Sequence, residues 1–296
     1  MIIAGHTLGT PGCDLAEALR LFGTAGLDAA EVIYQDDYPA SISPSDPRSA
    51  QQAAAIADAE GVPIVALTPY TTSINSVDAA SWQQGIDEFR ACLEAAHTVG
   101  ATRVRVYAGA WHPGDTDYAR HWEQLRSALT VLAPEAADAG VVLCVENHFG
   151  TMAQTAADTA RLVSEVGFPS VRVLYDQANL TFTHDETWQE AFAVQGELVG
   201  HVHVKDLVFK DPEAPFRASD TARVKAEERA VRSRVVGTGV VPWPDILEEL
   251  VRRGYDDVLS LEYEYRWHPQ DLPDPAIGFK ESALALRKML ATVVSA

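Results

Sequence analysis

Short runs of apolar, often β-branched residues alternate along the chain with longer, alanine-rich segments whose apolar positions recur at helical spacing. Short apolar runs predict buried strands, and long amphipathic segments predict helices. The predicted strands are Ile2–Gly5, Ala30–Tyr34, Pro63–Leu67, Arg103–Tyr107, Val141–Glu146, Arg172–Asp176, Gly200–Lys205 and Val258–Tyr263. The predicted helices are Asp14–Ala25, Pro47–Glu60, Ala80–Val99, Asp117–Ala139, Thr155–Val166, Glu186–Gln195, Trp243–Arg253 and Ile277–Val294.

This alternation of strands with helices is typical of parallel βαβ units. The strand at Val141–Glu146 is apolar up to its last residue, as expected for a strand that is covered on both faces. A chain of 296 residues has the length of one (β/α)₈ barrel. We therefore predict a single α/β domain over residues 1–296, a TIM barrel. A doubly wound open sheet is the alternative, but no glycine-rich phosphate loop follows the first strand.

One segment departs from the repeat. Residues Asp206–Val241, after the seventh predicted strand, are rich in charge, with Arg223–Arg229 as the densest part. A loop of this length in a compact domain is typically functional or disordered. It follows a barrel strand on the face where barrel enzymes place their active sites. The alternatives are a lid over that site, a solvated excursion and a contact between subunits of a homo-oligomer.

Charge and composition narrow the possible partners. The formal net charge is −19, which disfavours binding to nucleic acid or to an anionic membrane surface. No apolar run has the length of a membrane span, and the N-terminus enters a strand without a basic leader, so we expect a cytoplasmic protein. Three cysteines without CxxC spacing predict buried thiols and no disulfide framework.

Four polar side chains stand at or near the ends of predicted strands that should otherwise be apolar. They are Glu146, Asp176, His203 and Glu262. The first three follow one another at roughly the 31-residue spacing of a βα unit, and segment 206–241 lengthens the last interval. The carboxyl ends of neighbouring barrel strands meet at one rim, so these side chains should converge.

Three carboxylates that converge repel one another unless a cation lies between them. An oxygen-rich set with one imidazole suits Mn²⁺, Mg²⁺ or Co²⁺. We predict one divalent metal ion, with Mn²⁺ preferred and Mg²⁺, Co²⁺ or Zn²⁺ as alternatives. The competing interpretation is that each acid caps a helix or forms an ion pair at the rim.

Five ordered motifs carry a family resemblance. They are Val145–Thr151 (Val-Glu-Asn-His-Phe-Gly-Thr), Tyr175–Leu180, His201–Asp206, Gly237–Trp243 and Leu259–Glu264. The C-terminal half of the chain thereby resembles the sugar phosphate isomerase/epimerase family, in the superfamily of xylose isomerase-like barrels. The resemblance implies that Glu146, Asp176, His203 and Glu262 hold the metal. It also favours His203 as the ligand over His201, which shares its strand parity and would lie one layer deeper.

The departures from that superfamily are informative. Its apurinic endonucleases carry a histidine three residues after the aspartate of the sixth strand, and related ketose epimerases often have a substrate-contacting histidine there. This chain has Asn179 at that position, and no Asp-x-His follows its seventh strand. The resemblance therefore implies no DNA repair nuclease, and we expect Asn179 to contact a different substrate set.

Other polar residues near the predicted rim are candidates for substrate contacts. His6 could line the pocket or pack in the core, and Lys205 could reach a substrate oxygen or pair with a ligand carboxylate. Glu31, Tyr34, Tyr70 and Tyr107 border the same mouth, where rings could stack on a sugar or on one another. Arg234 and Arg266 could bind a phosphate or carboxylate, or anchor loops through salt bridges. His148, two residues after Glu146, could contact substrate or orient a ligand.

The resemblance implies a metal-dependent isomerase or epimerase that acts on a small sugar, sugar phosphate or polyol by proton transfer through an enediolate. Glu146 and Glu262 would move the proton. If the enolate instead expels a β-substituent, the enzyme is a lyase or dehydratase on a keto-polyol or 3-oxo-glycoside, with His148 or His6 as the proton donor. A catalytically silent barrel is a further alternative, which the complete ligand set disfavours.

Overall fold

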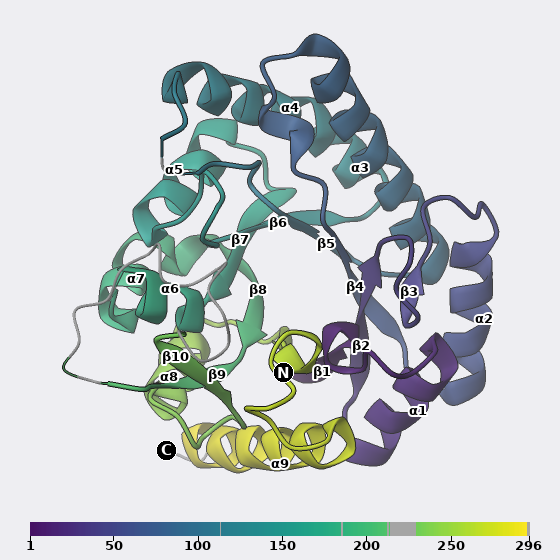
Figure 1. Ribbon diagram of the computed structural model, residues 1–296, viewed down its shortest axis with the longest axis vertical. Coiled ribbons are helices and arrows are strands. Elements are labelled where there is room, and N and C mark those ends of the chain that lie inside the picture. Colours follow the sequence, from purple (N-terminus) through teal and green to yellow (C-terminus); the bar gives the residue numbers. More distant parts are fainter. Residues whose placement is uncertain (113, 185, 212, 214–228, 295–296) are drawn as a thin grey trace.

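The computed structural model describes residues 1–112, 114–184, 186–211, 213 and 229–294. Its centre is a ring of parallel strands (Figure 1). These are β1 (Ile2–His6), β2 (Ala29–Tyr34), β4 (Ile64–Pro69), β5 (Arg103–Val106), β6 (Val142–Glu146), β7 (Val171–Asp176), β8 (Val199–Val204) and β11 (Val258–Leu261). Each strand pairs with the next, and β1 pairs with both β2 and β11, which closes the ring. The predicted TIM barrel is confirmed.

Helices surround this ring on the outside (Figure 1). They are α1 (Leu15–Ala25), α2 (Ser49–Glu60), α3 (Ala79–Val99), α4 (Tyr118–Asp138), α5 (Ala156–Val166), α7 (Trp188–Gln195), α8 (Trp243–Arg252) and α9 (Pro275–Val294). Local sequence explains their ends. Asp14 and Glu17 form a capping box at the start of α1, and Gly26 ends it with a left-handed φ of 82°. The predicted helices therefore agree with the observed ones to within a few residues.

The structure adds elements that the apolar pattern did not reveal. Helix α6 (Gln177–His184) follows Asp176 directly, and the two-residue strand β3 (Ser41–Ile42) pairs with β2. Short 3₁₀ turns lie at η1 (Thr7–Gly9), η2 (Ser73–Asn75), η3 (Gly196–Leu198) and η6 (Glu264–Arg266). Among the described residues, no helix is both long and apolar enough to cross a membrane.

The segment after β8, which we predicted as a long charged loop, contains two short strands at its ends. Strand β9 (Asp206–Phe209) pairs antiparallel with β10 (Val231–Arg234). Charged neighbours mask these two short runs in the sequence. Their paired residues, from Phe209 with Val231 to Asp206 with Arg234, lie far beyond the range of a hairpin turn signal. Most of the charged run Arg223–Arg229 lies outside the described residues, so a lid role for it stays a prediction.

Asp206 holds both ends of this excursion against the barrel. Its Oδ2 accepts the backbone N–H groups of Gly237 and Gly239, each at 2.9 Å. Its Oδ1 accepts those of Leu207 at 2.9 Å and Val241 at 3.1 Å. One buried carboxylate thus fixes the backbone on either side of β9 and β10, next to the site residues on β8.

We predict that Asp206→Ala lowers the free energy of unfolding by about 2–4 kcal/mol, because it leaves several N–H groups without their charged acceptor. Urea denaturation followed by circular dichroism measures this loss. Asp211→Ala, an exposed acid in the same segment, is the matched control and should leave the midpoint unchanged. An Asp206→Ala midpoint equal to that of the control would contradict the anchoring role.

Candidate metal centre at the barrel mouth

The four predicted ligands converge at the carboxyl ends of four neighbouring strands. Glu146 and Asp176 are the last residues of β6 and β7, His203 lies near the end of β8, and Glu262 follows β11. One ligand atom from each side chain lies within 4.8 Å of those from the other three. All four residues are buried. The strand spacing in the sequence therefore predicted this meeting point correctly.

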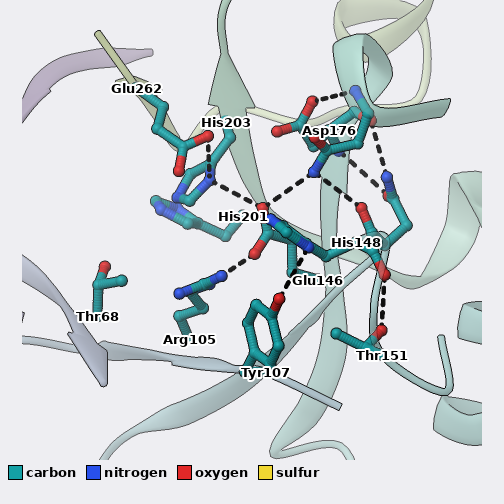
Figure 2. A network of polar contacts seen from close by, with 12 residues as sticks. Thr68, Arg105, Tyr107, Glu146, His148, Thr151, Asp176, His201, His203 and Glu262 are labelled. Carbon is teal, nitrogen blue, oxygen red and sulfur yellow. Dashed lines mark hydrogen bonds and ion pairs between the residues drawn. The ribbon is translucent and has the colours of Figure 1, made fainter. Parts of the chain in front are cut away.

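The nitrogen and oxygen atoms of the cluster face one another at distances longer than those of strong hydrogen bonds. His203 Nδ1 lies 3.5 Å from Glu146 Oε1 and 3.5 Å from Glu262 Oε2 (Figure 2). That nitrogen is buried and has no hydrogen-bond partner within the described part of the chain. A buried imidazole nitrogen aimed between two carboxylates has the geometry of a metal ligand whose partner is an ion.

The electrostatics of the cluster indicate a shortage of positive charge. Burial raises the pKa of Asp176 to about 7, with only partial compensation from Lys205. Burial alone would lower the pKa of His203, but the carboxylates of Glu31 and Glu262 raise it well above its ordinary value. A proton on His203 thus compensates part of the negative charge of the carboxylates, which a divalent ion would compensate more fully. Three carboxylates and one imidazole are a donor set that fits such an ion.

Lys205 supplies part of that charge. Its Nζ lies 2.7 Å from Glu262 Oε2, 2.9 Å from Asp176 Oδ2 and 3.7 Å from Glu264 Oε1. Of the two roles that we considered for Lys205, the structure shows the pairing with ligand carboxylates. A substrate contact by the same ammonium group stays a prediction.

A second layer of polar residues lies beneath the ligands. Both oxygens of Glu31 lie within 3.2 Å of His203 Nε2, and its Oε2 lies 2.9 Å from His201 Nε2. The hydroxyl of Thr68 donates to Glu31 Oε1. Because Nε2 of His203 is held by Glu31, the ring presents Nδ1 to the cluster. His203 therefore faces the cluster and His201 lies one layer deeper; that His203 is a metal ligand stays a prediction.

His6 also belongs to this lower layer. Its Nδ1 accepts the backbone N–H of Leu8 at 3.0 Å, and its Nε2 lies 3.0 Å from the Thr68 hydroxyl. The residue is fully buried, and burial lowers its pKa to about 4. Both ring nitrogens of this neutral histidine are engaged, so a direct substrate contact by His6 stays a prediction.

Sequence reasoning missed Arg105, which lies on β5 beside Glu146 (Figure 2). Its Nε donates to Glu146 Oε2 at 2.6 Å. Burial works against the ionised form of Glu146, yet this guanidinium outweighs burial and holds the pKa of Glu146 well below its usual range. The available signal was the same as for the acids: a charged residue within an apolar strand, here Arg-Val-Arg-Val at 103–106.

His148 and Tyr107 line the mouth next to Glu146 (Figure 2). His148 Nδ1 lies 2.6 Å from the carbonyl of Phe149, so this nitrogen carries the proton and donates. The hydroxyl of Tyr107 lies 3.2 Å from the same nitrogen. In the neutral ring, the lone pair is therefore on Nε2.

The remaining predicted substrate residues lie at different distances from the cluster. Asn179, on α6, donates from Nδ2 to Glu146 Oε1 at 3.2 Å, so it orients a ligand directly. Arg234 lines a small hollow together with Lys205 and Glu262. Arg266 is stacked at the rim, with its guanidinium carbon 4.5 Å from the ring centres of Tyr38 and Trp267. Substrate contacts by these three residues stay predictions.

Comparison with known proteins identifies the family. A family model described as the xylose isomerase-like TIM barrel matches residues 19–289. The chain belongs to this family. The resemblance inferred from the motifs of the C-terminal half is thereby confirmed, and it extends over nearly the whole barrel.

Several curated sequence relatives of this xylose isomerase-like barrel are inosose dehydratases. The rhizopine catabolism protein MocC of Rhizobium meliloti is 33% identical over 144 residues, 48% of this chain and 43% of that protein. The inosose dehydratase of Lacticaseibacillus casei is 26% identical over 143 residues, 48% of this chain and 47% of that protein. The chain thus spans less than half the length of either relative in these matches.

Solved structures of similar fold include sugar epimerases. The 3-keto-D-glucoside 4-epimerase of E. coli has a TM-score of 0.72 at 20% identity, covering 97% of this chain and 99% of that one. A xylose isomerase-like barrel from Mycobacterium smegmatis, in complex with magnesium, has a TM-score of 0.75 at 17% identity, covering 99% and 97%. At these identities the likeness shows the shared fold.

We predict that Glu31→Gln lowers the affinity of this family member for Mn²⁺ by about 10- to 100-fold, because a residue that orients a metal-binding histidine contributes that much. Titration calorimetry on metal-stripped protein measures the affinity. Glu123→Gln, a surface acid on α4 paired with Arg126, is the control and should bind like the wild type. Equal Mn²⁺ affinity in Glu31→Gln and wild type would refute the role of Glu31.

Proposed function

We propose that this protein is a divalent-metal-dependent isomerase or epimerase that moves a proton at the carbon next to the carbonyl of a small sugar or polyol ketone. The observation that supports it is the convergence of Glu146, Asp176, His203 and Glu262 within one buried cluster. These four side chains would hold the ion, for which Mn²⁺ is our preferred choice. When bound, such an ion acts as a Lewis acid on the carbonyl oxygen.

The two glutamates differ in what they offer the substrate. Glu146 is fully buried, and its oxygens already receive Arg105 and Asn179. Glu262 is 7% exposed, and its contacts with Lys205 and His203 both involve Oε2. We therefore assign the removal of the proton from carbon to Glu262, which then releases it to solvent. Glu146 would take up a proton from solvent and return it to the other face of the carbon. A positioned carboxylate of this kind contributes about 10²- to 10⁴-fold.

A dehydratase is the second candidate, because several of the curated relatives are inosose dehydratases. It requires a group that protonates the departing hydroxyl. His148 is suited to this step, since Nδ1 is bound to the carbonyl of Phe149 and Nε2 remains to hold or release a proton. Glu262 would remove the proton from carbon in both reactions. The two outcomes differ in whether a proton returns to the carbon or a hydroxyl leaves.

The dependence on metal is the first expected result. Dialysis against a chelator should abolish turnover of a ketohexose or an inosose, and stoichiometric Mn²⁺ should restore it. The reason is that the cations of the chain do not balance the negative charge of the carboxylate cluster. Metal analysis before and after dialysis accompanies the assay. Full activity of protein that retains less than a tenth of an equivalent of any divalent ion would contradict this proposal.

We expect Glu262→Gln to slow proton exchange by about 10²- to 10⁴-fold, because an amide does not accept the proton. The measurement is deuterium wash-in from heavy water at the carbon beside the carbonyl, by proton NMR, on D-fructose and on an inosose. Glu281→Gln, an exposed acid on α9, serves as the control. Undiminished exchange would rule out Glu262 as the base.

The same samples separate the two candidate reactions. An epimerase yields an isomer that carries solvent deuterium, whereas a dehydratase yields an enone that absorbs ultraviolet light and releases water. Deuterium exchange without formation of an enone supports the isomerase or epimerase. An enone as the sole product overturns that proposal in favour of the dehydratase.

A further inference from the structure

Arg105 is a buried cation whose position Glu146 alone does not explain. It is 3% exposed, on β5, and only its Nε is used in the pairing with Glu146 Oε2. Burial alone would lower the pKa of Arg105, but Glu146 raises it, so the guanidinium keeps its charge. A buried guanidinium carries five N–H donors in one plane and needs acceptors for those turned away from water.

Two aromatic rings hold the guanidinium in place. Its central carbon lies 5.1 Å from the ring centre of Tyr70 and 4.7 Å from that of Tyr107. These cation–π contacts restrain the guanidinium from swinging out to water. The N–H groups on its edge are therefore what Arg105 offers to a ligand.

One of those edge groups has no partner. Nη1 of Arg105 is buried and makes no hydrogen bond within the described residues. Arg103, two residues earlier on the same strand, is by contrast bonded to the carbonyl of Gly200 and paired with Asp257. A buried polar group without a hydrogen bond is unfavourable, and a charged one more so. Such a donor beside a site is expected to meet its acceptor when the site is filled.

We propose that Arg105 is a substrate-binding residue, whose Nη1–H donates to a substrate oxygen that carries negative charge in the enediolate. This inference rests on the proposed function. The contact would select for substrates that have an oxygen atom within reach of Nη1. Nε meanwhile stays on Glu146, so the planar group bridges a ligand carboxylate and the substrate. Arg105 keeps its proton throughout and breaks no bond; it contributes a charge-assisted hydrogen bond as negative charge develops.

The test uses oxalate, a planar dianion with adjacent oxygens like those of an enediolate, on Mn²⁺-loaded protein. Arg105→Lys keeps a positive charge next to Glu146 but lacks the second N–H group that the planar guanidinium holds in a fixed direction. Arg105→Met removes both. Arg103→Lys is the matched control on the same strand. Titration calorimetry gives two affinities for each variant, one for Mn²⁺ and one for oxalate.

We expect Arg105→Lys to bind Mn²⁺ like the wild type and oxalate about 10- to 100-fold more weakly, since a hydrogen bond to a charged group contributes that much. Arg103→Lys should change neither affinity. Oxalate affinity within twofold of wild type in Arg105→Lys overturns the proposal. So does an equal loss of both affinities, because a residue that only positions Glu146 would give that result. If Arg105→Met does not fold, Arg105→Lys decides alone.

The outcomes also separate this inference from the proposed function. Wild-type protein that binds Mn²⁺ and oxalate through Arg105, yet exchanges no proton in D-fructose or an inosose, overturns the proposed function and leaves the Arg105 contact standing. Wild-type protein that binds no divalent ion overturns both.

Discussion

The barrel mouth is organised around buried negative charge. Among the described residues that form it, Glu31, Glu146, Asp176 and Glu262 are buried carboxylates, and Arg105 and Lys205 are buried permanent cations. If a metal ion replaces the proton on His203, the four carboxylates and two cations leave a net charge of −2, which one divalent ion would balance. Unpaired charge in a protein interior costs several kcal/mol. The donor set, the orientation of His203 and the pairing of Lys205 all follow from this requirement.

The arrangement is built in layers along the barrel axis. His6, Thr68, His201 and Glu31 fix the lower side of His203, while Arg105 and Asn179 fix Glu146. Each of these side chains comes from a different element of the ring or its rim, so the barrel itself sets their distances. The positions of Glu146 and His203 thus depend on residues outside the four-residue cluster.

The sequence predicted the barrel because each βα unit repeats its own local pattern, and it predicted Glu146, Asp176, His203 and Glu262 because each interrupts an apolar strand end. It did not reveal Glu31 as a partner of His203, or Arg105 as a partner of Glu146. These contacts join strands that are 172 and 41 residues apart in the chain, and only the closed ring brings them together. The β9–β10 pairing, which is outside the ring, was missed because charged neighbours interrupt both short runs and no short hairpin turn joins them.

Asp206 ties down both ends of the β9–β10 excursion, one residue after Lys205. The carbonyl of Lys205 itself accepts the indole N–H of Trp243, at the start of α8. The connection beyond this clamp can therefore vary in length and composition during evolution without displacing His203.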